Sequence, residues 1–92
     1  MKIELKKFGN MLVSRPAGRE AWLVAQAYVL PRDKEEKIII DFAGVDVLAP
    51  SWADEFITNL IERFGRGNVN FLNTNNASVQ ATLESLHLPV VV

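Results

Sequence analysis

Ser51 offers the most chemistry in this sequence, because it stands directly before a helical pattern, where a hydroxyl can be exposed. Two roles are open for it. As a helix cap, its oxygen would accept a hydrogen bond from the N–H of Asp54, in a capping box that has Asp in place of Glu. As a free hydroxyl, it would be a phosphorylation switch. A phosphoryl group there would be favoured by the helix dipole and opposed by Asp54 and Glu55.

Catalysis by Ser51 would require a base, and His87 is the single histidine of the chain. A histidine near the C-terminal end of a helix more often interacts with terminal carbonyl groups. A Ser–His pair would also need an orienting carboxylate and an oxyanion hole, and the sequence shows neither. Asp41 and Asp46 could bind Mg²⁺, but such residues more often hydrogen-bond to loop amides. We therefore expect no enzymatic activity, no metal site and no cofactor.

The composition favours one soluble domain covering residues 1–92. An apolar fraction of 49% in 92 residues is sufficient for a globular core. The formal net charge of −1 gives no reason to expect nucleic acid as a partner. The absence of cysteine excludes disulfides, thiolate chemistry and cysteine-based zinc sites. No signal-peptide pattern is present and no apolar run approaches the roughly 20 residues that span a bilayer, so we expect a cytoplasmic protein without a membrane partner.

The segment that positions Ser51 is a strand, a loop and a helix over residues 37–64. Residues 38–42 form an apolar run broken only by Asp41, which is typical of a parallel strand covered on both faces. After a loop that contains glycine and proline, apolar residues recur with the spacing of one helix face, and Gly65 is expected to end the helix. That face consists of Ala53, Phe56, Ile57, Leu60, Ile61 and Phe64.

The N-terminal segment is predicted to form a β-hairpin. Residues 2–6 alternate between polar and apolar, which indicates a strand with one solvated face. Gly9 and Asn10 suit a two-residue turn, and residues 11–13 would form the returning strand.

A helix is predicted next, over residues 17–30. It begins after Ser14, with Pro16 tolerated in its first turn, and it stops before Pro31. Its second half is apolar on almost every side. This helix is therefore either wedged between neighbouring elements or available as an interaction surface.

The C-terminal part is predicted to add a strand over residues 69–73 and a helix capped by Asn75 or Asn76. Residues 90–92 would add a short final strand. The fold class is therefore α/β, a single mixed sheet in the order ββαβαβα, with short right-handed crossovers. The inward face of the last helix consists of Val79, Leu83 and Leu86.

Function in open α/β sheets gathers beyond the carboxyl ends of the parallel strands. The loops over residues 44–51 and 73–78 meet that description, and each leads into a helix N-terminus that could hold an anion. Neither GxGxxG nor GxxxxGK[ST] is present, so the sequence contains no nucleotide-binding motif. The candidate anion-binding residues are Ser51, Asn75, Asn76 and Ser78.

The run IIIDFAGVDVLAPSWADEFI, residues 38–57, resembles the segment that defines STAS domains (sulphate transporter and anti-sigma-factor antagonist). In that segment a buried strand ending in Asp leads to a helix capped by Ser. The chain is more similar still to a bacterial STAS-like family of unknown function, through the order and spacing of short motifs over nearly its whole length. Those motifs are Ser14-Arg15, Asp41-Phe42, Gly44-Val45, residues 51–56 and Phe71-Leu72-Asn73.

This resemblance implies a STAS-like fold and a regulatory role without catalysis. Anti-sigma-factor antagonists bind a GHKL-type kinase, which phosphorylates a serine at the start of the helix, and Ser51 matches that serine. The sequence Ala49-Pro50-Ser51-Trp52 departs from the antagonists' pattern, Asp-Ser-Ser/Thr-Gly. Relatives of the STAS-like family are sometimes joined to GHKL-type ATPase domains, so the resemblance implies a protein partner of this kind.

Three functions are compatible with these observations. The first is an interaction module that regulates a partner, such as a GHKL-type ATPase or kinase, through residues 45–55. The second is a small-anion or nucleotide-binding domain, and the third is a structural unit that forms a homodimer through the first helix. For the first function Trp52 is the expected anchor, because buried aromatic residues dominate many interfaces. The candidate partner surface comprises Val47, Pro50, Trp52, Asp54 and Glu55.

Overall fold

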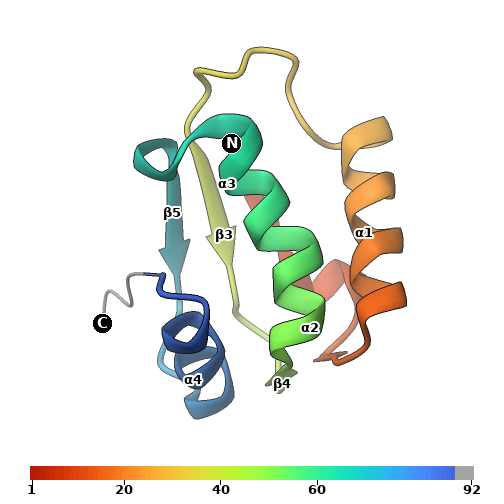
Figure 1. Cartoon of the computed structure of the whole chain (residues 1–92), viewed down its shortest axis with the longest axis vertical. Coiled ribbons are helices and arrows are strands. Elements are labelled where there is room, and N and C mark those ends of the chain that lie inside the picture. Colours follow the sequence, from red (N-terminus) through yellow and green to blue (C-terminus); the bar gives the residue numbers. More distant parts are fainter. Residues whose placement is uncertain (89–92) are drawn as a thin grey trace.

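The structure is a computed structural model that describes residues 1–88, and it shows helices packed against a small parallel sheet (Figure 1). The predicted final strand over residues 90–92 lies outside the described residues. The elements are β1 (Lys2–Glu4), the 3₁₀ turn η1 (Leu5–Phe8), β2 (Met11–Leu12), α1 (Arg15–Tyr28), β3 (Ile38–Asp41), β4 (Val47–Leu48), α2 (Pro50–Ala53), the π-helical turn η2 (Asp54–Thr58), α3 (Asn59–Phe64), the 3₁₀ turn η3 (Arg66–Asn68), β5 (Val69–Leu72) and α4 (Ala77–Ser85).

The strands of residues 1–88 form two sheets, and every strand pair is parallel. In the three-stranded sheet β3 lies between β1 and β5, so that Ile40 is opposite both Ile3 and Phe71. In the second sheet β2 pairs with β4, and Leu12 is opposite Leu48. The α/β class is confirmed, although the sheet predicted as mixed is wholly parallel.

The predicted hairpin is wrong. The chain leaves β1 through η1, whose Leu5 is fully buried, and Gly9 then adopts a positive φ of 123° before β2 begins. Consequently β1 and β2 join different sheets, and β2 pairs with β4 in the segment predicted to be a loop. The observed order is ββαββαβα, because burial of Leu5 and long-range pairing outweigh the local turn signal.

The three-stranded sheet has one covered and one open face. The side chains of Ile38 and Ile40 are fully buried, whereas Ile39 between them is 38% exposed. Leu72, which follows the same alternation in β5, is also exposed. The expectation that β3 is covered on both faces is therefore wrong. The reason is that α2 and α3 cross the sheet on the side of Ile38 and Ile40 (Figure 1).

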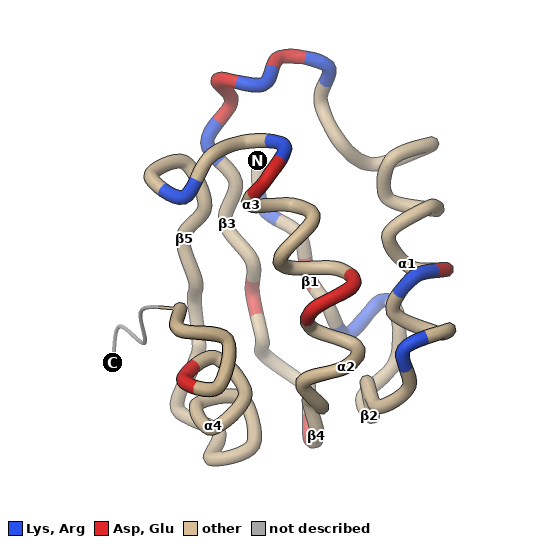
Figure 2. Tube along the Cα trace, viewed as in Figure 1, with Lys and Arg blue, Asp and Glu red and all other residues tan. Residues whose placement is uncertain are grey.

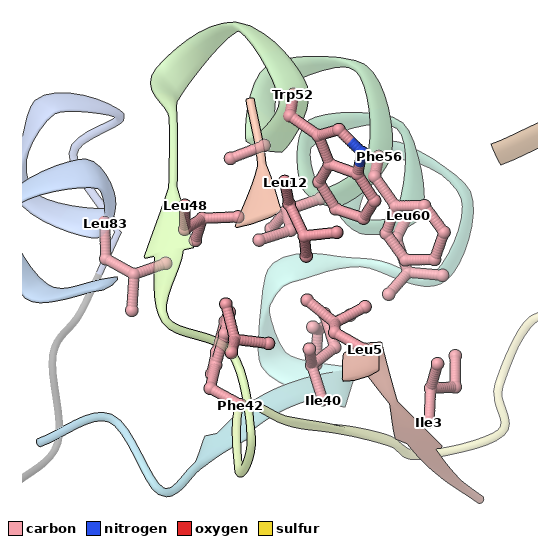
Figure 3. Packing of buried hydrophobic residues seen from close by; sticks show 14 of the residues in the cluster. Ile3, Leu5, Leu12, Ile40, Phe42, Leu48, Trp52, Phe56, Leu60 and Leu83 are labelled. Atoms are coloured by element: carbon pink, nitrogen blue, oxygen red, sulfur yellow. The ribbon is translucent and has the colours of Figure 1, made fainter. Parts of the chain in front are cut away.

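The hydrophobic core lies between the covered face of the sheet and the helix formed by α2, η2 and α3. Figure 3 shows Phe56 and Leu60 on this helix opposite Leu5 and Ile40 of the sheet side. These residues are fully buried, which confirms the predicted helix face. Gly65 ends the helix as predicted, with a φ of 90°.

The middle of this helix is a π-helical turn, η2, rather than an α-helical one. A π turn accommodates more residues than an α turn and often lies near functional positions. Here the side-chain amide of Asn59 donates to the carbonyl oxygen of Glu55 at 2.6 Å.

Helix α1 begins at Arg15, two residues before the predicted start, because the Ser14 hydroxyl caps it by accepting from the N–H of Ala17 at 3.2 Å. It ends at Tyr28 rather than at the predicted residue 30. It packs against α2 and η2 at close range. A Cβ on Gly18 would lie 2.7 Å from the carbonyl oxygen of Trp52, so only glycine fits this helix crossing.

Candidate functional site

Ser51 lies in the first turn of α2 but does not cap it. The N-cap residue is Ala49, Pro50 is the first helical residue, and no side chain caps this end. The Ser51 hydroxyl instead donates to the carbonyl oxygen of Val13 at 3.0 Å, so the predicted capping box with Asp54 is wrong. The physical reason is Pro50, whose fixed φ suits the first helical position and therefore starts the helix one residue before Ser51.

Asp54 and Glu55 bind Arg15 of α1 and take no part in capping the start of α2. The Arg15 guanidinium donates to Asp54 Oδ2 at 2.9 Å and to Glu55 Oε1 at 3.1 Å. These hydrogen bonds, first that to Asp54 and then that to Glu55, raise the pKa of Arg15. Figure 2 shows this acidic segment of the helix beside the basic segments of α1. The pairing joins the starts of α1 and α2 into one charged surface.

Trp52 is buried in the core, with 1% of its surface exposed. Its ring stacks on Phe56 (Figure 3), with 5.1 Å between centroids and 19° between planes. It also lies near the ring of Phe8, at 6.3 Å between centroids. The prediction of Trp52 as an exposed anchor is therefore wrong. Trp52 and Phe56 are four residues apart and share one helix side. That spacing could have shown that the buried face begins at Trp52, one residue before Ala53.

The other four residues of the candidate partner surface retain accessible side chains. Pro50 is exposed, and Val47, Asp54 and Glu55 are each partly exposed. Ser51, also partly exposed, lies among them. The start of α2 therefore presents a mixed polar and apolar surface, with its hydroxyl next to an ion-pair cluster.

The loops over residues 44–51 and 73–78 contact each other, and their polar groups bind each other rather than an anion. The Asn76 amide nitrogen donates to the carbonyl oxygens of Val45 and Asp46, at 3.3 and 3.1 Å. The Ser78 hydroxyl accepts from the N–H of Leu48 at 3.0 Å. Two of the residues predicted to hold an anion, Asn76 and Ser78, thus connect the start of α4 to β4 and the residues before it.

The start of α4 offers few donors to an anion. Asn76 caps it, as one of the two predicted alternatives, by accepting from the N–H groups of Ser78 and Val79 at 2.7 and 3.1 Å. Those N–H groups are the donors that an anion would need. Asn75 is exposed. Anion binding stays a prediction, which calorimetric titration with phosphate, ATP or GTP would test.

Asp41 is a buried carboxylate at the end of β3 with a full set of partners. It accepts from the Asn73 amide at 2.8 Å and from the N–H of Ala43 at 2.9 Å, and it pairs with Lys2 at 3.2 Å. The hydrogen bond from Asn73 lowers the pKa of Asp41, with Ala43 and Lys2 acting in the same direction against the effect of burial. This cluster fixes the carboxyl ends of β3 and β5.

Asp46, the second acidic residue considered for Mg²⁺, accepts from the Asn10 amide at 2.8 Å. Within residues 1–88 no group of three or more histidine, cysteine, aspartate or glutamate residues could hold a metal ion. His87 is exposed and follows α4 with a positive φ of 56°. The Ser51 hydroxyl points to a backbone carbonyl rather than to a base, so the geometry contains no Ser–His pair poised for catalysis.

No helix among residues 1–88 has the length and apolar character that crossing a bilayer requires. Neither the curated proteins nor the solved structures contain a match to the chain. The model of one protein family, described as "STAS-like domain of unknown function (DUF4325)", matches residues 27–79. The match runs from the end of α1 to the start of α4, which is more than half of the chain and less than the near-complete likeness expected from the motifs. The chain therefore belongs to this family of STAS-like domains of unknown function.

Proposed function

We propose that this domain is a regulatory module without catalytic activity, which binds a partner protein through the surface at the start of α2. The observation that carries the proposal is the position of Ser51. Its hydroxyl is partly exposed, is bound to one backbone carbonyl, and is not needed as a cap. A hydroxyl in this position can be contacted or modified without disrupting the helix.

The surroundings of Ser51 would make a modification effective. Asp54 and Glu55 follow it by three and four residues and thus share its side of the helix. A phosphoryl group on Ser51 would add up to two negative charges beside these carboxylates, and it would compete with them for Arg15. Phosphorylation would therefore rearrange the ion-pair cluster that connects α1 and α2.

A GHKL-type ATPase or kinase is the partner class that we propose. The proposal rests on membership of a STAS-like family and on the match of Ser51 to the serine at the helix start of STAS antagonists. With Trp52 in the core, the contact surface consists of Val47, Pro50, Ser51, Asp54 and Glu55.

The test is to incubate the chain with a GHKL-type kinase from the same genome and labelled ATP, and to measure both phosphate transfer and binding. Ser51→Ala should abolish transfer, and Ser51→Asp should weaken binding. Ser85→Ala and Ser85→Asp are matched controls, because Ser85 is exposed at the end of α4 and its hydroxyl also donates to a backbone carbonyl. Transfer that persists in Ser51→Ala, or equal loss of binding in the Ser85 variants, would contradict the proposal.

A further inference from the structure

A pocket of about 300 Å³ opens between α1 and the segment that contains η1 and β2. Its lining includes the buried Trp52 and, from α1, Ala21 and Val24. Ligand pockets usually have volumes of roughly 300–1,000 Å³, so this one lies at the small end and suits a single large side chain. It is lined by Phe8, Met11, Leu12, Ala17, Glu20, Ala21, Val24 and Trp52.

Among the described residues that line this pocket, Glu20 is the only charged one. Among residues 1–88 its carboxylate has no ion-pair or hydrogen-bond partner. The pocket therefore combines apolar walls with one hydrogen-bond acceptor. An aromatic ring that carries a donor hydroxyl is complementary to this combination.

Tyr28 of α1 supplies such a ring, and 86% of it is exposed, the largest exposed fraction among the large hydrophobic residues of the described part of the chain. Glu20 and Tyr28 each lie four residues from Val24, on the same side of the helix. At a rise of 1.5 Å per residue they are about 12 Å apart along the axis, with Val24 at the midpoint. Tyr28 does not line the pocket of its own chain, and its spacing from Val24 places it opposite Glu20 of a second, antiparallel copy.

We infer that the pocket is filled by Tyr28 of a second copy of this chain, in a dimer whose twofold axis passes near Val24. A twofold axis there makes the two α1 helices antiparallel, so that each Tyr28 faces the Glu20 of the other copy. Each Tyr28 ring enters the opposite pocket and its hydroxyl donates to the Glu20 carboxylate. Met11, exposed to 61% on the pocket rim, and Val24 become covered.

The rest of the α1 surface allows this approach. Helix α1 lies at one side of the molecule, with no other element beyond it (Figure 1). Ala17 and Ala21 on the pocket side have small side chains, which let two helices come close. The interface does not include Ser51, Asp54 or Glu55, so it is independent of the function proposed for the start of α2.

Sedimentation velocity over a concentration series tests the inference. The unmodified chain should self-associate, and Tyr28→Ala should raise the dimer dissociation constant at least about thirtyfold, as for an aromatic residue at an interface centre. Tyr28→Phe should raise it about two- to tenfold, through loss of one hydrogen bond. Leu23→Ala is the matched control, because Leu23 is exposed to 53%, does not line the pocket and lies about 100° around α1 from Val24, and it should change the constant less than about twofold.

Disulfide trapping provides a second readout, because the natural chain has no cysteine. In V24C the two introduced thiols would meet at the twofold axis, so oxidised glutathione should yield a covalent dimer, whereas L23C should remain monomeric. A chain that stays monomeric at the highest attainable concentration would overturn the inference. The inference would also be overturned by equal trapping of V24C and L23C, or by unchanged association of Tyr28→Ala. A pocket that only a different protein covers would overturn it as well.

Discussion

The starts of α1 and α2 lie side by side, and each has a serine and a proline, but in opposite order. At α1 the serine precedes the proline, and the Ser14 hydroxyl is used as a cap by the N–H of Ala17. At α2 the proline comes first, and Ser51 lies within the first turn with its hydroxyl directed to Val13. The position of proline thus decides whether a serine hydroxyl stabilises the helix or remains on the surface.

Of the substitutions at the two helix starts, removal of the buried Trp52 side chain of α2 should have the largest effect on stability. We expect Trp52→Ala to lower the free energy of unfolding by about 3–5 kcal/mol, because it leaves a large cavity beside Phe56. Urea denaturation measures this loss. Trp22→Ala is the control and should cost less, since Trp22 is only partly buried. Equal losses of unfolding free energy in the two variants would show that Trp52 does not hold the start of α2 in the core.

The next largest effect should come from separating the two helix starts. Gly18→Ala places a Cβ 2.7 Å from the Trp52 carbonyl oxygen, where backbone must move. We expect a loss of about 1–3 kcal/mol, as for overpacked sites. Thermal unfolding of Gly67→Ala provides the control, because nothing lies within 4 Å of a Cβ there. A melting temperature as high for Gly18→Ala as for that control would contradict the close helix contact.

Replacing each serine in turn measures how much each hydroxyl contributes to the free energy of unfolding. Ser14→Ala removes a cap and should cost about 1 kcal/mol. Ser51→Ala removes one partly exposed hydrogen bond and should cost at most about 0.5 kcal/mol. Chemical denaturation of both variants under the same conditions distinguishes the two roles. A larger loss for Ser51→Ala would mean that its hydroxyl is structural.

The smallest expected effect is a gain. Ala49 is the N-cap residue of α2 and has the extended backbone conformation of a capping residue, but its side chain cannot accept a hydrogen bond. Ala49→Ser should therefore stabilise the domain by about 0.5–1 kcal/mol. Ala81→Ser, on the exposed side of α4, should give no gain. If both substitutions behave alike in thermal unfolding, α2 has no need of a cap.

Local patterns in the sequence predicted the elements but not their partners. The helix entry after Ser14, the buried face of the long helix and its end at Gly65 are determined by neighbours within a few residues, and the structure contains all three. The pairing of β1 with β3 and of β2 with β4 joins segments far apart in the chain. No local signal specifies such pairs, and the turn signal at Gly9 and Asn10 indicated a hairpin instead.

For the candidate site too, the local features were predicted and the long-range contacts were not. The sequence located Ser51 at a helix start, and the spacing of Ser51 to Asp54 suggested a capping box. No local pattern indicates that Arg15, thirty-nine residues from Asp54, binds both acidic side chains. The burial of Trp52 was predictable from its spacing to Phe56, whereas its interfacial role was an expectation from residue type alone.

The π turn between α2 and α3 sets the rotation of α2 relative to α3 about their common helix axis. Each residue of an α-helix rotates the chain by about 100°, so one residue more or fewer within this turn would change the angle between Trp52 and Phe64 by that amount. Both residues are now buried on the same side. A single-residue deletion within Asp54–Thr58 would turn either Trp52 or Phe64 toward solvent. It would also move the Ser51 hydroxyl away from the Val13 carbonyl oxygen. The number of residues in this one turn therefore constrains which side chains the domain can show to a partner.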